Sequence, residues 1–158
     1  ALPDMQLKEI IHDKRQIIVG MKAKSRWEAI ATLLDALVES GGLARADLEP
    51  VHDNVRQRET TLSTGIGNGI ALPHALTDRV TRVVGAVGVS RCGIPFESVD
   101  GAPVTLVVLF LVPKGQSKEH LGTLANIARL LNRPEFRQRI ESSPNAAALL
   151  EVIRSGVA

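Results

Sequence analysis

The sequence predicts a single α/β domain in which strands and helices follow one another without a long linker. Its 158 residues are the size of one ordinary domain. Hydrophobic residues make up 44% of the chain and charged residues 23%, which predicts a packed core under a solvated surface. Segments with the period of a strand and segments with the period of an amphipathic helix are mixed along the chain. We therefore expect one domain over residues 1–158.

The first predicted elements are a short strand and a capped helix. The segment Gln16–Val19 has the composition of a strand. Ser25, with Glu28 three residues later, forms the pattern of a capping box at the start of a helix. Apolar residues then recur with the helical period as far as Val38, and Gly41 ends the helix.

A second helix and a glycine-rich segment come next. The helix is predicted from Asp47 to about Arg58, along one apolar stripe. The glycine-rich segment 64–69 follows and leads into the short apolar segment 70–72. This glycine-rich segment is the most unusual part of the chain.

Two strands and three helices are predicted for the rest of the chain. The segments 83–89 and 104–112 have strand composition, and the second is apolar throughout, so we expect it to be buried on both faces of a sheet. Ser117 begins an amphipathic helix. Pro134 and Pro144 are each expected at the first position of a further helix, where proline is tolerated.

Composition excludes several classes of protein. The formal net charge is only +2 and the basic residues are scattered, which disfavours nucleic-acid binding, and aromatic residues are only 3% of the chain, too few for a platform that stacks single strands. Cys92 is the only cysteine, so the chain has no intrachain disulfide and no cysteine metal site, a pattern that fits the cytoplasm. The longest apolar segment, 104–112, is far shorter than the roughly 20 residues that span a bilayer, and no basic-then-apolar secretion signal is visible in the sequence.

The segment Glu59–Ala75 carries the chemistry. Its three glycines, at 65, 67 and 69, allow the backbone N–H groups to converge on one point and bind an oxyanion. A short apolar strand then ends at Pro73, whose fixed φ restricts how His74 leaves the sheet. A histidine held beside an anion-binding loop is well placed to receive a phosphoryl group.

Phosphoryl transfer explains why these residue types occur together. A neutral imidazole has a nitrogen that can attack phosphorus, and its ordinary pKa is about 6.5. Positive charge and hydrogen-bond donors stabilise the phosphoryl oxygens in the transition state. The guanidinium of Arg58 is a suitable planar donor. The expected phosphate-binding residues are those of the loop, namely Ser63, Thr64, Gly65, Gly67, Asn68 and Gly69.

The segment Glu59–Ala75 resembles the signature of the fructose/mannitol-type IIA family of the bacterial sugar phosphotransferase system, which includes nitrogen-regulatory IIA proteins. The resemblance implies a mixed sheet flanked by helices and a phosphorylated histidine at His74. It also implies a second functional histidine at His120, followed by Leu121, and a role for the pair Arg58-Glu59. The implied partners are an HPr-type phosphocarrier as donor and a IIB component or regulated proteins as receivers. A membrane is contacted only through a IIB/IIC permease, and neither cofactor nor metal is implied.

Other functions stay open at this point. A IIA-like interaction module of a transcriptional regulator would bind partners without transferring phosphate. A metal-dependent hydrolase using His74 and His120 is disfavoured, because two histidines without a carboxylate cluster make a poor ligand set. His12 and His52 have no motif around them, and Cys92 is expected to be a packing residue.

Overall fold

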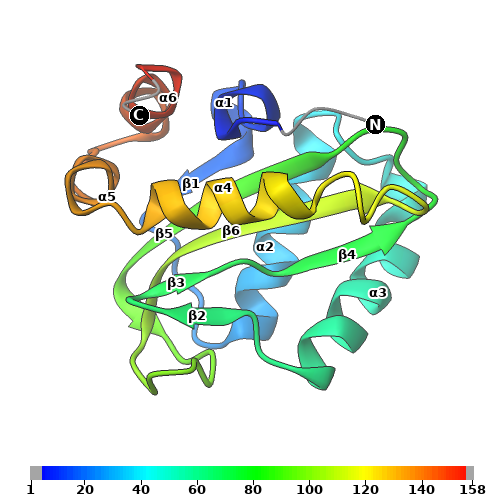
Figure 1. The fold of residues 1–158 in the computed structure, drawn as a ribbon, viewed down its shortest axis with the longest axis horizontal. Helices are drawn as coiled ribbons and strands as arrows, with labels where there is room; N and C mark the ends of the chain where they lie inside the picture. The colour runs from blue at the N-terminus through cyan, green and yellow to red at the C-terminus, as the bar shows by residue number, and fades with distance from the viewer. Residues whose placement is uncertain (1–4, 156–158) are drawn as a thin grey trace.

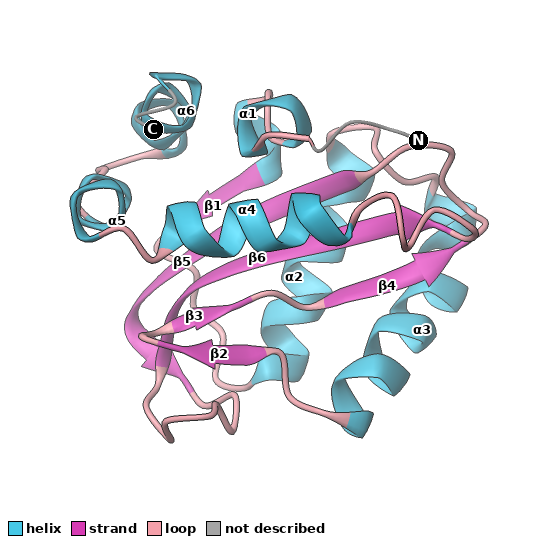
Figure 2. Cartoon of the chain, viewed as in Figure 1, coloured by secondary structure: helices cyan, strands magenta, loops and turns pink. Residues whose placement is uncertain are grey.

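A mixed β-sheet forms the middle layer of the molecule, with helices on both faces (Figures 1 and 2). The computed structural model describes residues 5–155. The strands are β1 (Ile17–Val19), β2 (Gly65–Gly67), β3 (Ile70–Ala71), β4 (His74–Thr77), β5 (Val84–Ile94) and β6 (Val104–Pro113). Their order in the 6-stranded sheet is β1-β5-β6-β3-β2, and β4 also pairs with β6. The pairs β1–β5, β3–β6 and β4–β6 are parallel, whereas β5–β6 and β2–β3 are antiparallel. The predicted α/β class with a mixed sheet is confirmed.

The helices divide between the two faces of the sheet. They are α1 (Leu7–Ile10), α2 (Arg26–Glu39), α3 (Leu48–Thr61), α4 (Leu121–Leu131), α5 (Pro134–Glu141) and α6 (Ala146–Ser155), with short 3₁₀ turns η1 (Lys14–Gln16) and η2 (Arg45–Asp47). Helices α2 and α3 pack on one face, and α1, α4, α5 and α6 pack on the other (Figure 1). Within the described part of the chain, every helix is too short or too polar to cross a membrane.

Strand β6 links the two hydrophobic cores. Side chains alternate across a strand, and along β6 Val107 and Leu109 join the core under α2 and α3, whereas Val108 and Phe110 join the core under α4, α5 and α6. All four side chains are fully buried. The expectation that this strand is buried on both faces is confirmed, and it explains why its sequence shows no polar alternation.

Helix α2 begins and ends at the predicted residues. The Ser25 hydroxyl oxygen accepts a hydrogen bond from the Glu28 N–H at 3.2 Å, which is one half of the predicted capping box. Gly41 adopts a φ of +84°, the left-handed conformation that favours glycine after a helix.

Helix α3 differs from its prediction at its C-terminal end. Asp47 is the N-cap residue, as predicted, but its side chain does not cap the helix and accepts a hydrogen bond from the Arg79 guanidinium at 3.0 Å. The helix continues to Thr61, beyond the expected end near Arg58. Arg58 therefore lies in the last helical turn, where its Nη1 donates to the Leu62 carbonyl at 2.9 Å.

Two of the three later helix starts also differ from prediction. Ser117 lies in a turn, and α4 begins only after His120, which occupies the N-cap position. Pro144 lies before α6, and Asn145 caps that helix by accepting the Ala148 N–H at 2.9 Å. The proline expected at the first position of α5 is there.

Candidate functional site

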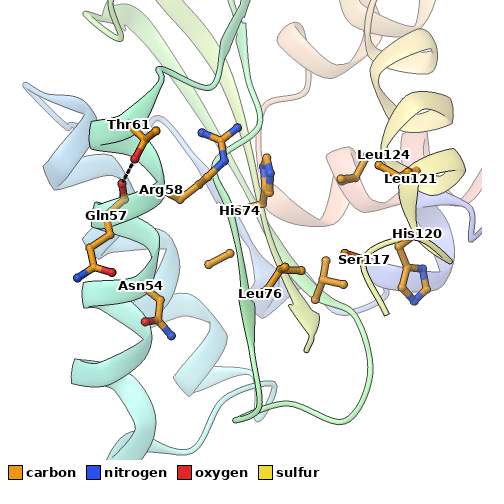
Figure 3. Close-up of a pocket in the computed structure, with 12 residues that line it drawn as sticks. Asn54, Gln57, Arg58, Thr61, His74, Leu76, Ser117, His120, Leu121 and Leu124 are labelled. Carbon is orange, nitrogen blue, oxygen red and sulfur yellow. Dashed lines mark hydrogen bonds between the residues drawn. The ribbon is translucent and has the colours of Figure 1, made fainter. Parts of the chain in front are cut away.

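His74 lines an open cavity of about 450 Å³ between the last turns of α3 and the start of α4 (Figure 3). It is the first residue of β4, a strand that pairs with the inner strand β6. The Phe110 N–H donates to the Pro73 carbonyl at 3.0 Å, which fixes the backbone just before His74. The cavity is lined by Asn54, Gln57, Arg58, Thr61, His74, Ala75, Leu76, Val112, Ser117, His120, Leu121 and Leu124.

A hydrogen bond within the chain sets the protonation of the His74 ring. Its Nδ1 lies 2.8 Å from the carbonyl oxygen of Leu72. A carbonyl only accepts hydrogen bonds, so Nδ1 carries the proton and the lone pair of the neutral ring is on Nε2. Burial lowers the pKa of His74 below its ordinary value of 6.5, the bond to the Leu72 carbonyl opposes this shift, and the nearby positive charge of Arg58 adds to it. The ring is therefore neutral at pH 7 and has a free Nε2.

The structure brings Arg58 and His74 together. Figure 3 shows the guanidinium of Arg58, on α3, on the same side of the cavity as the His74 ring, on β4. The bond from Arg58 to the Leu62 carbonyl holds the side chain along the end of its helix. A partly exposed guanidinium beside a neutral imidazole is suited to an anionic group that reaches Nε2.

His120 lines the same cavity but is not hydrogen-bonded to His74. Its side chain is buried, with 3% exposed, and in Figure 3 it points away from His74. Its Nε2 lies 3.2 Å from Oε1 of Gln116 and its Nδ1 lies 3.5 Å from the Thr123 hydroxyl. The resemblance led us to expect a ring that contacts His74 or its phosphoryl group, and in this conformation both nitrogens have other partners.

The glycine-rich loop does not surround His74, contrary to expectation. It forms the hairpin β2–β3, whose turn residues Asn68 and Gly69 have φ values of +56° and +76°. Three of the N–H groups that were expected to bind an oxyanion are already bonded inside the protein: Thr64 to Glu59, Gly65 to the Ser63 hydroxyl, and Asn68 to Asp100.

None of the six predicted phosphate-binding residues lines the His74 cavity. These residues are Ser63, Thr64, Gly65, Gly67, Asn68 and Gly69. Asn68 instead contributes to a separate polar hollow beside α5. Because the loop forms a hairpin away from the cavity and three of its N–H groups have partners, these residues are not part of the site proposed below.

Sequence reasoning missed the helical side of the cavity. Asn54, Gln57 and Thr61 lie with Arg58 on one face of α3, at the spacing i, i+3, i+4 and i+7. That spacing was visible in the sequence, but the helix was predicted to stop near Arg58, so Thr61 was not expected on it. The rim also carries exposed apolar side chains from two elements, Leu76 with 43% and Leu121 with 65% exposed.

The remaining candidate residues lie elsewhere. Neither His12 nor His52 lines the cavity. Cys92 is exposed, so the expectation that it packs in the core is wrong. Within residues 5–155, no three His, Cys, Asp or Glu side chains gather as ligands for a metal ion.

Comparison with known proteins identifies the family. Residues 10–156 match the family described as phosphoenolpyruvate-dependent sugar phosphotransferase system, EIIA 2. The chain belongs to this family. It is 34% identical over 151 residues to the nitrogen regulatory protein of Pseudomonas aeruginosa, an alignment that covers 94% of this chain and 95% of that one.

Solved structures show the same fold. The crystal structure of nitrogen regulatory protein IIA-Ntr from Neisseria meningitidis has a TM-score of 0.81 and 26% identity, covering 93% of this chain and 98% of that chain. The structure of the Escherichia coli complex of enzyme IIA-mannitol with phosphorylated enzyme IIB-mannitol has a TM-score of 0.75 and 21% identity, covering 92% and 98%. Proteins of the IIA type are phosphotransfer components of the sugar phosphotransferase system.

Proposed function

We propose that this chain is a phosphocarrier that accepts a phosphoryl group on Nε2 of His74 and passes it on. One observation carries the proposal: the bond from Nδ1 to the Leu72 carbonyl leaves a neutral ring whose only lone pair lies on Nε2. A lone pair in an open cavity beside a guanidinium is what in-line attack on phosphorus requires.

The transfer step needs no proton movement on His74. The lone pair of Nε2 forms the new bond to phosphorus while the P–N bond of a donor phosphohistidine breaks, and that electron pair returns to the donor nitrogen. Nδ1 keeps its proton and its bond to Leu72 throughout. Arg58 donates to the phosphoryl oxygens, whose charge grows in the transition state.

His120 has a secondary role in this proposal. In this conformation Nε2 of His120 lies 3.2 Å from Oε1 of Gln116, and the ring points away from His74 (Figure 3). A change of side-chain rotamer is required before that ring can reach a phosphoryl group on His74.

The rim of the cavity supports a protein as the phosphoryl donor. Leu76 and Leu121 are large apolar side chains that stay exposed beside the reactive ring. Exposed apolar groups with a charged neighbour are typical of a docking surface. We propose an HPr-type phosphocarrier as donor, and a IIB cysteine or a regulated protein as the receiver. The cytoplasmic location expected from the sequence stays a prediction.

The decisive experiment is phosphorylation with purified components. The chain is incubated with phosphoenolpyruvate, enzyme I and an HPr protein, and its intact mass is followed. Wild type and a His52→Ala control gain one phosphoryl group, whereas His74→Ala gains none. Phosphate gain by His74→Ala would refute the assignment.

The same experiment tests the alternative function, a IIA-like interaction module that binds partners without transferring phosphate. If wild type gains no phosphate from any phosphorylated HPr-type donor, that result supports an interaction module of a transcriptional regulator.

The receiver is a separate question, and regulation is the favoured answer. The match to the P. aeruginosa nitrogen regulatory protein spans nearly the whole of both chains. Phosphorylated protein is mixed with a mannitol-type IIB domain, and transfer to its cysteine is measured. Slow or absent transfer, with the phosphate retained on His74, supports a regulatory signal. Rapid transfer contradicts a purely regulatory role and indicates transport.

A further inference from the structure

Glu59 is a buried carboxylate next to Arg58 in sequence, yet it does not line the cavity. Its side chain is 1% exposed. Burying a carboxylate is costly unless hydrogen bonds and a positive charge compensate for the lost water. Oε1 accepts from the Thr64 hydroxyl at 2.6 Å, Oε2 accepts from the Thr64 N–H at 3.0 Å, and Nη1 of Arg26 lies 3.4 Å from Oε2.

From Thr64 the hydrogen bonds continue to the reactive ring. The carbonyl of Thr64 accepts from the Leu72 N–H at 3.1 Å. The carbonyl of Leu72 in turn accepts from Nδ1 of His74 at 2.8 Å. A buried carboxylate on α3 is thereby joined to the imidazole through two residues, one before β2 and one after β3.

Pairing with Arg26 alone does not explain this arrangement. Arg26 has a second carboxylate partner, Glu97, at 3.0 Å, whose side chain is 79% exposed. The shortest contacts of Glu59 go instead to the N–H and hydroxyl of Thr64, so this carboxylate fixes the backbone and the rotamer of one residue.

We propose that Glu59, supported by Arg26, is a positioning residue that holds the Leu72 carbonyl in place and thereby fixes the orientation and tautomer of the His74 ring. This inference rests on the proposed function of His74. It gives a physical reason for an acidic residue at the start of the Glu59–Ala75 segment. Hydrogen bonds from Glu59 to Thr64 and from Thr64 to Leu72 hold together the two ends of the glycine hairpin, which in this proposal does not bind phosphate.

The proposal predicts the direction in which the pKa of His74 changes when Glu59 loses its charge. The charged or titratable groups near His74 are Arg58 and Glu59 from α3 and His120 before α4. Burial lowers the pKa of His74, whereas the bond to the Leu72 carbonyl and the charge of Glu59 raise it. Glu59→Gln removes one raising effect and weakens the other, so the pKa of His74 falls. General loosening of the fold would admit water and move the pKa upward, toward 6.5.

The test compares the two carboxylates that share Arg26. In Glu59→Gln and the matched control Glu97→Gln, the His74 ring is titrated by NMR and phosphoryl acceptance from phosphorylated HPr is timed. Glu59→Gln is expected to lower the pKa of His74 and slow acceptance by about threefold to tenfold, the size of one lost hydrogen bond. Glu97→Gln is expected to match wild type in both. An unchanged rate, or an unchanged or raised pKa, in Glu59→Gln overturns the proposal.

A second pair of variants keeps the test open if Glu59→Gln does not fold. Thr64→Val removes the hydroxyl but keeps the backbone groups, and it is expected to shift the His74 titration and the rate in the same direction. Thr64→Ser keeps the hydroxyl and is expected to restore both; equal behaviour of the two variants overturns the proposal. The titration requires no phosphate, so a wild type that is never phosphorylated refutes the proposed function while Glu59 is still tested.

Discussion

Replacing Arg58 by glutamine removes the guanidinium beside His74 and leaves a shorter, uncharged polar side chain. The change leaves the helix intact, since glutamine is nearly as good a helix former as arginine. The bond from Arg58 to the Leu62 carbonyl lies at an exposed helix end, and its loss is expected to lower the free energy of unfolding by less than about 1 kcal/mol. Stability and catalysis are therefore separable at this position.

The effect on transfer is expected to be much larger. A hydrogen bond from a charged group to a phosphoryl oxygen contributes about 1.5–3 kcal/mol. If Arg58 makes that bond chiefly in the transition state, its loss slows acceptance by His74 about tenfold to a hundredfold. Arg58→Lys keeps the charge but not the planar fork, so it is expected to fall between glutamine and wild type.

Rapid-quench kinetics measures the rate of phosphoryl acceptance, and urea denaturation measures the free energy of unfolding, so the two together check both predicted effects. Arg56→Gln is the matched control, because Arg56 lies on the same helix, is exposed and does not line the cavity. It is expected to transfer at the wild-type rate. Equal rates for Arg58→Gln and Arg56→Gln would refute a role of Arg58 at the phosphoryl group.

Other positions give independent tests of the fold and of the site. Gly93→Ala is expected to lower the free energy of unfolding by more than Gly101→Ala in urea titrations, because both have positive φ but only at Gly93 would the new Cβ lie 2.9 Å from Cβ of Pro103, whose rigid ring cannot swing away; equal losses would contradict this. Gln16→Leu leaves four backbone partners of one buried amide unsatisfied and is expected to cost about 2–4 kcal/mol, so a loss below about 1 kcal/mol contradicts the role of that amide. Because the pKa of His74 is lowered in the folded protein, the unfolded ring takes up its proton first as the pH falls below 6.5, and the free energy of unfolding decreases between 6.5 and the lower folded pKa. His74→Ala is expected to lose less stability over that range. Parallel plots of unfolding free energy against pH for wild type and His74→Ala would contradict the shift.

The sequence predicted the main layers and the reactive residue for identifiable reasons. The apolar segment around Val108 has no polar alternation because both of its faces are covered, and this made an inner strand predictable. The motif that ends in Pro73-His74 combined a histidine, a residue that can carry a phosphoryl group, with an unusual glycine content. The pairing of His74 with Arg58 followed from that motif, and the structure brings both to one cavity.

Strand β4 could not be recognised from its sequence. Its buried positions carry Ala75 and Thr77, whereas Leu76 between them is 43% exposed at the rim of the cavity. The alternation of hydrophobicity is therefore the reverse of a half-buried strand, and no local pattern predicts the strand. The exposed leucine makes sense only once the cavity beside it is known.

The role of the glycines was misjudged because an anion-binding loop and a tight hairpin turn both require glycine. The dipeptide Asn68-Gly69, flanked by apolar residues, is itself a strong signal for a tight hairpin turn, and the structure has positive φ at both positions. Which N–H groups remain free depends on distant residues such as Asp100 and could not be deduced locally. His120 was expected to reach His74 or its phosphoryl group, but its ring orientation depends on Gln116 and Thr123.

The site of phosphorylation within the imidazole tests the account most directly. Protein labelled with ¹⁵N is phosphorylated by HPr, and long-range ¹H–¹⁵N spectra of the histidine rings are recorded. The geometry predicts phosphate on Nε2 of His74, with the proton still on Nδ1 and bonded to Leu72. Phosphate on Nδ1, or on the ring of His120, would contradict it.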